Sequence, residues 1–272
     1  MHEKILITGC STGIGRSTAL CSHGRGHTVI ATARRPETLD GLPDDIVKLQ
    51  LDVCDTGSVD RAIAEANERC GAITAVVNNA GYGQAGPVEC VTEEQVRAQF
   101  DTNVEGPLRV IRAVLPQMRE GGHGTIVNVS SAAGRFSTPF LGVYCASKFA
   151  LEALSDALRI EVEPFGVRVV IIEPGPITTN FGEIALGSTE ATILDDPDNP
   201  YHRRATRAAT IDDALERFFK SPSDVAKVIV ASIEARSPRA RRTITLPAKM
   251  GAVTAMFPTV LIDHLLRRVL DK

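Results

Sequence analysis

The sequence carries no strong charge of either sign. Its 272 residues include 30 basic and 33 acidic side chains, which are interspersed and leave a formal net charge of −3. Proteins that bind nucleic acid or adhere to anionic membranes concentrate positive charge, and the composition shows no such excess. We therefore expect neither nucleic acid nor an anionic membrane surface as a partner.

The cysteines lack any pattern that would bind a metal or build a disulfide framework. No two of them form a C-x-x-C pair, and no histidine stands near them at the spacing of metal ligands. The N-terminus also lacks the basic and apolar regions of a signal peptide, because Met1 runs directly into a strand-like segment at 4–8. These absences predict a chain without a metal site in a reducing, cytoplasmic setting. The six cysteines are Cys10, Cys21, Cys54, Cys70, Cys90 and Cys145.

Long hydrophobic runs are missing as well. A helix that crosses a bilayer needs about 20 consecutive apolar residues, and no segment reaches that length. We therefore expect no transmembrane segment, and we expect a helical tail at 250–272 that can still rest against lipid. The C-terminal run at 253–270 is interrupted by Pro258, Asp263, His264, Arg267 and Arg268.

Short apolar runs of strand length alternate with longer segments of helical periodicity. This alternation is typical of βαβ units, which build a parallel sheet covered by helices on both faces. Continuous apolar runs such as Val-Val-Ile-Ile at 169–172 suit strands that are buried on both sides. We expect strands at 5–8, 28–33, 47–51, 75–78, 125–129, 167–173 and 243–246. We expect helices near 13–22, 59–69, 93–118, 143–162 and 222–235.

The length of the chain fits one domain, since α/β folds of this size commonly remain undivided. We therefore predict an α/β fold, a single-domain, Rossmann-type, doubly wound parallel sheet of about seven strands that occupies residues 1–272. The stretch 182–201 is rich in glycine, aspartate and proline and is expected to be a mobile loop. We predict a substrate loop or lid at 182–212, which would line the substrate pocket together with 134–143 and the C-terminal tail.

A glycine-rich segment, Thr-Gly-Cys-Ser-Thr-Gly-Ile-Gly at 8–15, joins the first expected strand to the first expected helix. Its glycines allow a tight turn and a close approach of the backbone to a pyrophosphate, and the helix N-terminus offers free N–H groups and partial positive charge. The spacing is G-x-x-x-G-x-G, and a purely structural turn remains an alternative. We predict a dinucleotide site formed by Gly9, Ser11, Thr12, Gly13, Ile14 and Gly15.

The residues after the second expected strand indicate which dinucleotide binds. An acidic residue at the end of this strand normally holds the ribose hydroxyls of NAD, whereas arginine accommodates the 2′-phosphate of NADP. Here Ala33 occupies that position and Arg34 and Arg35 follow, so NADP(H) is favoured over NAD(H). The alternative is that both arginines are solvated loop residues. Asp52, which precedes Val53 after the third expected strand, is either a hydrogen-bond acceptor for the adenine amino group or an ordinary turn residue.

Tyr144 and Lys148 stand four residues apart in a strongly helical segment, so they lie on one face, one turn apart. A phenol titrates near 10, and a neighbouring ammonium lowers that pKa by stabilising the phenolate. Ser131 ends the fifth strand run at the carboxyl edge, where open α/β sheets bind ligands, and its hydroxyl can hydrogen-bond a substrate oxygen. An isolated match of this kind more often reflects a packed tyrosine beside a solvated lysine. The phosphate loop and Ser131 together favour the catalytic interpretation.

Together these residues resemble the short-chain dehydrogenase/reductase family from about residue 4 to residue 179. The glycine motif of the family is matched within 8–15, and its Asn-Asn-Ala-Gly motif is matched at 78–81. The resemblance implies that Asn79, Ala80 and Gly81 border the adenosine of the cofactor. The family's catalytic tetrad of asparagine, serine, tyrosine and lysine is matched by Asn103, Ser131, Tyr144 and Lys148.

The resemblance also implies roles for single residues. Asn103 would hold a water that links Lys148 to solvent, although read alone it is only a polar kink in a long helix. Lys148 would bind the nicotinamide ribose as well as lower the pKa of the tyrosine. The segment Pro-Gly-Pro-Ile-Thr at 174–178 is similar to the family segment that meets the nicotinamide carboxamide. That contact would involve Pro174, Gly175, Ile177 and Thr178, with Thr179 as a substitute for Thr178.

Two further points concern specificity. Many NADP-preferring members of the family carry a basic residue just before the second glycine, where this chain has Thr12, so Arg34 must carry most of the preference. The stretch 143–152 resembles the 17β-hydroxysteroid and retinol dehydrogenase branch, which implies a lipophilic alcohol or ketone as substrate. Family members are usually dimers or tetramers, so the resemblance implies a homo-oligomer.

The sequence therefore predicts hydride transfer between NADP(H) and an alcohol or ketone, with Tyr144 as the proton-transferring residue. One rival is an NADP(H)-sensing regulatory protein that keeps the fold and has lost catalysis, but the complete tetrad opposes it. A second rival is a nucleotide-sugar epimerase, which shares the Tyr-x-x-x-Lys pattern. Epimerases usually have a longer C-terminal substrate domain and a G-x-x-G-x-x-G loop, and both features are missing here.

Overall fold

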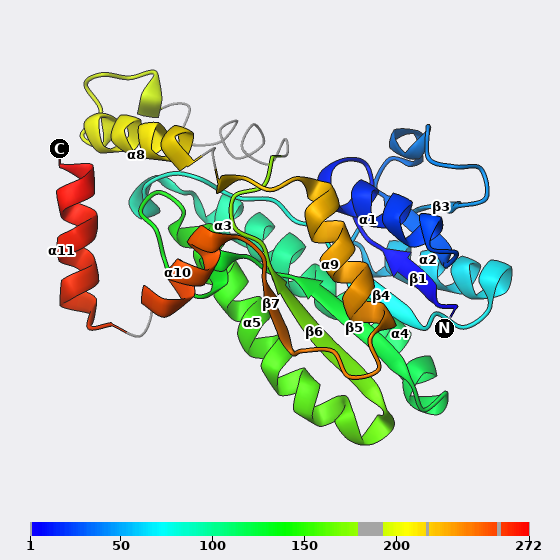
Figure 1. Ribbon diagram of the computed structural model, residues 1–272. Helices are drawn as coiled ribbons and strands as arrows, with labels where there is room; N and C mark the ends of the chain where they lie inside the picture. The colour runs from blue at the N-terminus through cyan, green and yellow to red at the C-terminus, as the bar shows by residue number, and fades with distance from the viewer. Residues whose placement is uncertain (1, 179–192, 216–217, 255–256, 272) are drawn as a thin grey trace.

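The computed structural model describes residues 2–178, 193–215, 218–254 and 257–271, and it is built around one parallel sheet of seven strands (Figure 1). The strand order is β3-β2-β1-β4-β5-β6-β7, so the direction of the crossovers reverses between β1 and β4. The predicted doubly wound parallel sheet is thereby confirmed. The strands are β1 (Lys4–Ile7), β2 (Thr28–Ala33), β3 (Val47–Gln50), β4 (Ala75–Asn78), β5 (Gly124–Val129), β6 (Val167–Glu173) and β7 (Arg241–Thr243).

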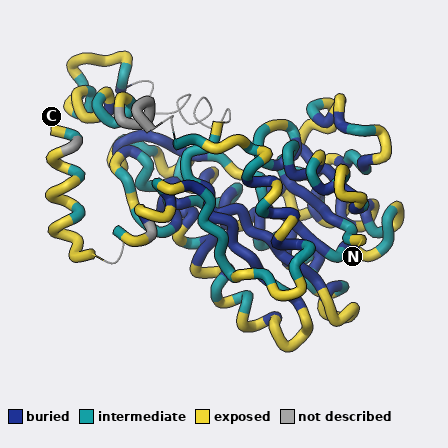
Figure 2. Tube along the Cα trace, in the orientation of Figure 1, coloured by how far each residue is buried: buried dark blue, intermediate teal, exposed yellow. Residues whose placement is uncertain are grey.

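Helices cover both faces of the sheet because successive residues of each strand point to opposite sides. In β1, Ile5 and Ile7 face the cluster that holds α1 (Gly13–Gly24) and α9 (Pro222–Glu234). Leu6 points the other way, into the cluster that holds α2 (Thr56–Cys70) and α4 (Gly106–Glu120). Each of these three side chains is fully buried, and a buried side chain of this size contributes about 1.5–3 kcal/mol. Figure 2 shows the buried core running through the strands.

The segment 93–118, predicted as one helix, is interrupted by a π turn. Helix α3 (Glu93–Phe100) begins with a capping box formed by Thr92 and Gln95, and η3 (Asp101–Glu105) separates it from α4. The N–H of Gly106 donates to the carbonyl of Asp101, five residues back. A Cβ on Gly106 would lie 2.9 Å from the Cβ of Val53, so only glycine allows this close approach. The prediction of an uninterrupted helix is wrong at this point.

The next long helix carries two of the predicted catalytic residues, Tyr144 and Lys148. The long helix α5 (Gly142–Val162) follows η4 (Ala132–Gly134) and packs against β6. Among the residues that the structure describes, no helix combines the length and apolarity needed to cross a bilayer. The short helical turns are η1 (Pro36–Leu39), η2 (Val88–Cys90) and η5 (Glu163–Phe165).

The C-terminal third differs most from the prediction. Helix α8 (His202–Leu215) was not predicted, because it is mostly polar and its buried contact is a small cluster of Phe140, Ile193 and Ala205. The strand predicted at 243–246 lies at Arg241–Thr243 instead, and Leu246 begins helix α10 (Leu246–Thr254). Helix α11 (Thr259–Leu270) follows and stands beside α8 at the end of the molecule away from β3 (Figure 1). Residues 182–192 of the predicted loop lie outside the described residues.

Candidate active site

Three of the predicted catalytic side chains meet beside the carboxyl end of β5. Tyr144 and Lys148 lie in the first two turns of α5 and are only 7% and 6% exposed. Ser131 stands two residues beyond the end of β5, and its Oγ accepts a hydrogen bond from the backbone N–H of Ala133 in η4. This serine side chain also hydrogen-bonds Tyr144. The structure therefore brings a partly exposed serine hydroxyl together with a buried phenol and a buried ammonium.

Lys148 is held by the end of the same strand. Its Nζ donates a hydrogen bond of 2.9 Å to the carbonyl of Val129 and lies 5.9 Å from the centroid of the Tyr144 ring. A Cβ on Gly81 would lie 3.7 Å from the same Nζ, so the Asn-Asn-Ala-Gly segment also borders the ammonium. The side chains of Tyr144 and Lys148 thus face one common space and do not point apart.

Burial sets the protonation of this group more strongly than the sequence argument assumed. Burial raises the pKa of Tyr144 to about 12, and the hydrogen bond with Ser131 opposes that rise. Burial lowers the pKa of Lys148 to about 8, and the negative charge of Glu152 opposes that fall. The expectation that Lys148 would bring the phenol pKa down is therefore corrected, because desolvation is the largest influence and the hydrogen bond with Ser131 is the influence that lowers the pKa. Tyr144 is a neutral phenol near pH 7, and a neutral phenol can donate a proton.

The side-chain atoms of Asn103 are occupied by hydrogen bonds to residues next to this group. Its Nδ2 donates to the carbonyl of Tyr82 at 2.9 Å and to Oγ of Ser147 at 3.1 Å, while its Oδ1 accepts from the N–H of Tyr82 at 3.1 Å. Ser147 in turn donates to the carbonyl of Tyr144 at 2.7 Å. Asn103 in the π turn therefore ties the segment after β4 to the first turn of α5. Its predicted role in holding a water stays a prediction.

The glycine-rich loop has the shape that a pyrophosphate requires. Gly9 and Gly13 have positive φ values of 72° and 58°, which other residues adopt only with strain. Thr12 precedes the first turn of α1, and its side chain makes no capping hydrogen bond. The Thr12 side chain therefore does not occupy the N–H groups at the helix N-terminus that would bind a phosphate. Residues Ser11, Ile14 and Gly15 complete this loop.

The Asn-Asn-Ala-Gly segment braces that loop from β4. The side-chain amide of Asn79 donates to the carbonyls of Thr8 and Gly9 at 2.9 and 3.1 Å. The hydroxyl of Thr8 accepts from the N–H groups of Asn79 and Ala80, both at 3.0 Å. A Cβ on Gly15 would lie 2.2 Å from the carbonyl oxygen of Gly9, so the helix can approach the loop only without a side chain. A preformed cradle of this kind fits a dinucleotide phosphate.

The residues predicted to select the cofactor lie at the carboxyl ends of β2 and β3. Arg34 is exposed, and no residue in the described part of the chain forms an ion pair with its guanidinium. Arg35 lies 3.9 Å from Glu37, and its side chain is 77% exposed. Asp52 accepts a hydrogen bond from the N–H of Cys54 through one oxygen, next to the buried Val53. Arg34 is therefore the arginine whose charge is available to a ligand.

The segment after β6 has one backbone edge without a partner among the described residues. Thr178 donates its N–H to the carbonyl of Lys220 at 3.0 Å, and Lys220 donates to the carbonyl of Pro176 at 3.3 Å. In such a parallel bridge the N–H and C=O of the residue between, Ile177, point to the opposite side. Pro174 accepts from the N–H of Ala132, which connects this segment to η4. Thr179 lies outside the described residues.

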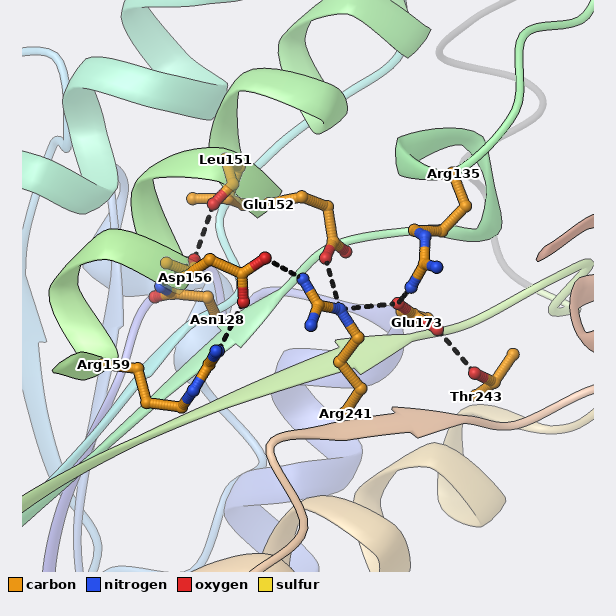
Figure 3. Close-up of polar contacts among 10 residues, drawn as sticks. Asn128, Arg135, Leu151, Glu152, Asp156, Arg159, Glu173, Arg241 and Thr243 are labelled. Atoms are coloured by element: carbon orange, nitrogen blue, oxygen red, sulfur yellow. Dashed lines mark hydrogen bonds and ion pairs between the residues drawn. The ribbon is translucent and has the colours of Figure 1, made fainter. Parts of the chain in front are cut away.

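A charge network behind Lys148 was not predicted from the sequence. Arg241 on β7 lies between three carboxylates, with Nε 3.1 Å from Glu152 Oε2 and 3.4 Å from Glu173 Oε1, and it also pairs with Asp156 (Figure 3). Arg135 reaches Glu173 from the other side at 3.2 Å. Burial raises the pKa of the Glu152 carboxyl, and Arg241 is among the groups that oppose this rise. The one signal in the sequence is that Glu152 follows Lys148 by four residues on the same helical face.

No metal centre accompanies this site within the described residues, because no three of their His, Cys, Asp or Glu side chains cluster as ligands. Cys10, within the glycine-rich loop, is fully buried, and burial raises the pKa of its thiol to about 12. A thiol held neutral in this way is a poor nucleophile and a poor ligand.

Comparisons with known proteins agree with this arrangement. The family model described as short chain dehydrogenase matches residues 3–185. The chain is 37% identical to 17-beta-hydroxysteroid dehydrogenase type 1 from Homo sapiens over 251 residues, which covers 87% of this chain and 76% of that protein. It is 36% identical to retinol dehydrogenase 8 from Bos taurus over 274 residues, with 94% and 86% coverage.

Solved structures show the same likeness in three dimensions. A short-chain dehydrogenase from Streptomyces avermitilis superposes with a TM-score of 0.81 and 33% identity, covering 99% of this chain and 95% of that one. Two more distant structures are a Burkholderia phymatum family member in complex with NAD and a serine dehydrogenase complexed with NADP+. They share 25% and 27% identity, with TM-scores of 0.77 and 0.75, and cover 97% and 89% of this chain and 95% and 94% of their own.

Proposed function

This chain belongs to the short-chain dehydrogenase/reductase family, and from that premise we propose that it transfers a hydride between NADP(H) and a lipophilic alcohol or ketone. The hydrogen bond between Ser131 and Tyr144, with Lys148 beside the tyrosine ring, is the observation that carries this proposal. Packing alone gives no reason to bury a phenol and an ammonium side by side, next to a serine hydroxyl, at the carboxyl edge of a sheet.

The bound nicotinamide would supply or accept the hydride. Tyr144 would donate its phenol proton to the carbonyl oxygen of the substrate, and it would receive a proton from the alcohol in the opposite direction. Ser131 would hold the same oxygen and stabilise the negative charge that develops on it. Lys148 would bind the ribose and supply positive charge beside the phenol. With a pKa raised to about 12, Tyr144 would be protonated near pH 7, which is the form that donates the proton in carbonyl reduction.

A dinucleotide would bind along the edge that these elements share. The loop from Gly9 to Gly15 would hold the pyrophosphate, Asp52 and Val53 would border the adenine, and the segment from Asn79 to Gly81 would border the adenosine. Pro174, Gly175, Ile177 and Thr178 would meet the carboxamide, and the open backbone edge of Ile177 supports this contact. Related structures carry NAD or NADP+, so the family supports a nicotinamide dinucleotide of either kind.

The preference for NADP(H) rests on Arg34. Its guanidinium follows β2, where the 2′-phosphate of NADP would lie, and Ala33 offers no carboxylate to the ribose hydroxyls of NAD. An arginine without an ion-pair partner among the described residues can form a charge-assisted fork with that phosphate. Arg35 would contribute less, because Glu37 lies beside it.

The lipophilic substrate class is supported by the relatives and by the described part of the expected pocket wall. The relatives are named for steroid and retinol chemistry. In the segment 134–143, Phe140 packs with Ile193 and Ala205, and Phe136 lies against Gly251 of α10. An apolar wall of this kind binds apolar ligands. A homo-oligomer remains part of this proposal on the resemblance, and a cytoplasmic setting remains part of it on the free cysteines of the described chain.

An NADPH-oxidation screen over steroids, retinoids and small ketones tests the proposal. We expect turnover with at least one bulky apolar ketone, and faster turnover with NADPH than with NADH. Tight NADPH binding without turnover on any carbonyl would favour the regulatory alternative instead. Turnover confined to small polar ketones would keep the reductase activity and remove the lipophilic substrate class.

A further inference from the structure

Large apolar side chains are exposed mainly in one place on the molecule. The described residues include thirteen exposed large hydrophobic side chains, and seven of them lie between residues 246 and 265. We call these seven the C-terminal apolar face. Six of them lie on α10 and α11, and Phe257 lies in the link between these helices. Figure 2 shows α11 as largely exposed. They are Leu246, Met250, Val253, Phe257, Val260, Leu261 and Leu265, each 46–81% exposed.

The spacing of these residues gives each helix an outward apolar side. On α10, Leu246, Met250 and Val253 follow at intervals of four and three residues and share one side. The buried residues Ala248 and Gly251 lie between them, and Gly251 contacts the ring of Phe136. The inward side of α10 is thus already occupied by the protein, while the outward side has no described partner.

Helix α11 likewise has one side next to the protein, at α8, and one apolar side that points outward. The carboxylate of Asp271 at its end pairs with Arg204 of α8 at 2.7 Å. Leu261 and Leu265 are 46% and 51% exposed and are four residues apart, so they point outward together. In Figure 1 the helix stands at the edge of the molecule, with α8 as its neighbour.

Basic side chains border the C-terminal apolar face. Lys249 of α10 lines a cleft together with Arg239 and Arg242, next to strand β7. No described side chain forms an ion pair with any of these three, whereas Arg241 in the same cleft is matched by Glu152, Asp156 and Glu173. Helix α11 adds the exposed Arg267 and Arg268. The one acidic residue of α10 and α11 is Asp263, so the surroundings are strongly positive.

We propose that the C-terminal apolar face docks this protein onto the surface of an anionic lipid bilayer. Apolar side chains on exposed helices, bordered by arginine and lysine, are the features that place a protein in the membrane interface, where chains insert and headgroup phosphates attract the cations. A second copy of the chain is a poorer occupant. A two-fold contact would set the same basic residues against each other, with Asp263 as the one acidic residue of the two helices to offset them.

This proposal departs from the expectation, drawn from the net charge of −3, that an anionic membrane surface is no partner. The net charge hides the local positive charge because acidic residues elsewhere in the chain cancel it. Docking would also bring the segment at Phe136, which contacts α10, close to the lipid. Apolar substrates dissolved in the bilayer would then reach the protein without crossing water.

Flotation of the full-length protein with lipid vesicles tests the proposal without substrate or cofactor. We expect binding to vesicles of equal parts phosphatidylglycerol and phosphatidylcholine, and little binding to phosphatidylcholine alone. The double variant Met250→Gln/Leu261→Gln should bind about thirtyfold more weakly. The single variant Lys249→Glu should bind about tenfold more weakly at low salt, and 0.5 M NaCl should reduce this difference.

The matched control is Leu20→Gln/Ile160→Gln. These residues are 44% and 63% exposed, close to the 46% and 61% of Leu261 and Met250, but they lie on α1 and α5. The control should bind vesicles like the natural chain, and circular dichroism should show that all variants are folded. Equal loss of binding in the control, or no binding to anionic vesicles by the natural chain, would overturn the proposal. A different outcome would assign the C-terminal apolar face to a second copy of the chain. In that case the natural chain would not bind vesicles but would self-associate, and Met250→Gln/Leu261→Gln would abolish the self-association.

Discussion

Charged side chains are buried and paired behind α5, whereas they are exposed and without described ion-pair partners on the two C-terminal helices. Behind α5, Lys148, Glu152 and Glu173 are buried, and Arg241 neutralises the two carboxylates. On α10 and α11, exposed apolar side chains stand among arginines and lysines that have no ion-pair partner in the described part of the chain. Where charges are buried they must be matched, because an unpaired charge in a low dielectric is costly. Where they are unmatched they remain in contact with water and are available to an external partner.

The first way to break this comparison is to remove Arg241, which has the largest expected effect on stability. Arg241→Met would leave the buried carboxylates of Glu152 and Glu173 without their shared cation, and we expect a loss of about 3 kcal/mol in the free energy of unfolding. Urea denaturation measures this loss. Arg239→Met, an exposed arginine on the same cleft, should change stability by less than about 0.5 kcal/mol. Equal effects of the two substitutions would show that burial does not distinguish them.

The second test sharpens the comparison at an exposed charge near the cofactor. Arg34→Ala removes the guanidinium that we propose for the 2′-phosphate, and it should raise the KM for NADPH about tenfold, since a hydrogen bond to a charged group contributes roughly 1.5–3 kcal/mol. The KM for NADH should change little, because NADH lacks that phosphate. Steady-state kinetics with both cofactors provide the measurement, and Arg35→Ala is the control with a smaller expected effect. Equal changes for both cofactors would refute the assignment.

The third and smallest effect concerns pH. Lys148 has a pKa lowered to about 8 by burial, so its charged form is present below pH 8 and is lost as the pH rises through 8. The negative charge of Glu152 opposes this lowering. Glu152→Gln should therefore move the alkaline limb of the kcat/KM profile to lower pH, whereas Glu161→Gln, on the exposed side of the same helix, should leave it in place. A limb that moves to higher pH would contradict the sign of this electrostatic account.

Much of the fold could be predicted from sequence because its signals are local. The apolar run of β6 and the periodicity of α5 depend only on neighbouring residues, and both elements appear within one residue of their predicted bounds. The glycine-rich loop was equally readable, since its spacing directly reflects backbone conformation at Gly9 and Gly13. The π turn was not, because it depends on the approach of Gly106 to Val53, 53 residues away in the chain.

The residue types of the candidate site could be predicted from the sequence, but their ion pairs and protonation states could not. Arg241 lies 89 residues from Glu152 and has no periodic relation to it, so only the fold brings them together. The protonation of Tyr144 depends on how deeply it is buried, and the Tyr-x-x-x-Lys pattern gives no measure of that depth. Helix α8 was missed for a related reason, because Ala205 is its fully buried contact in a mostly polar segment.

Substitution of Tyr144 by phenylalanine tests the central claim most directly. The variant keeps the ring that packs beside Lys148 and removes only the hydroxyl that meets Ser131. Turnover of NADPH with an accepted ketone and NADPH affinity from fluorescence titration should be measured on the same preparation. The account predicts that turnover is abolished while NADPH binding stays close to that of the natural chain. Near-normal turnover in this variant would contradict the account.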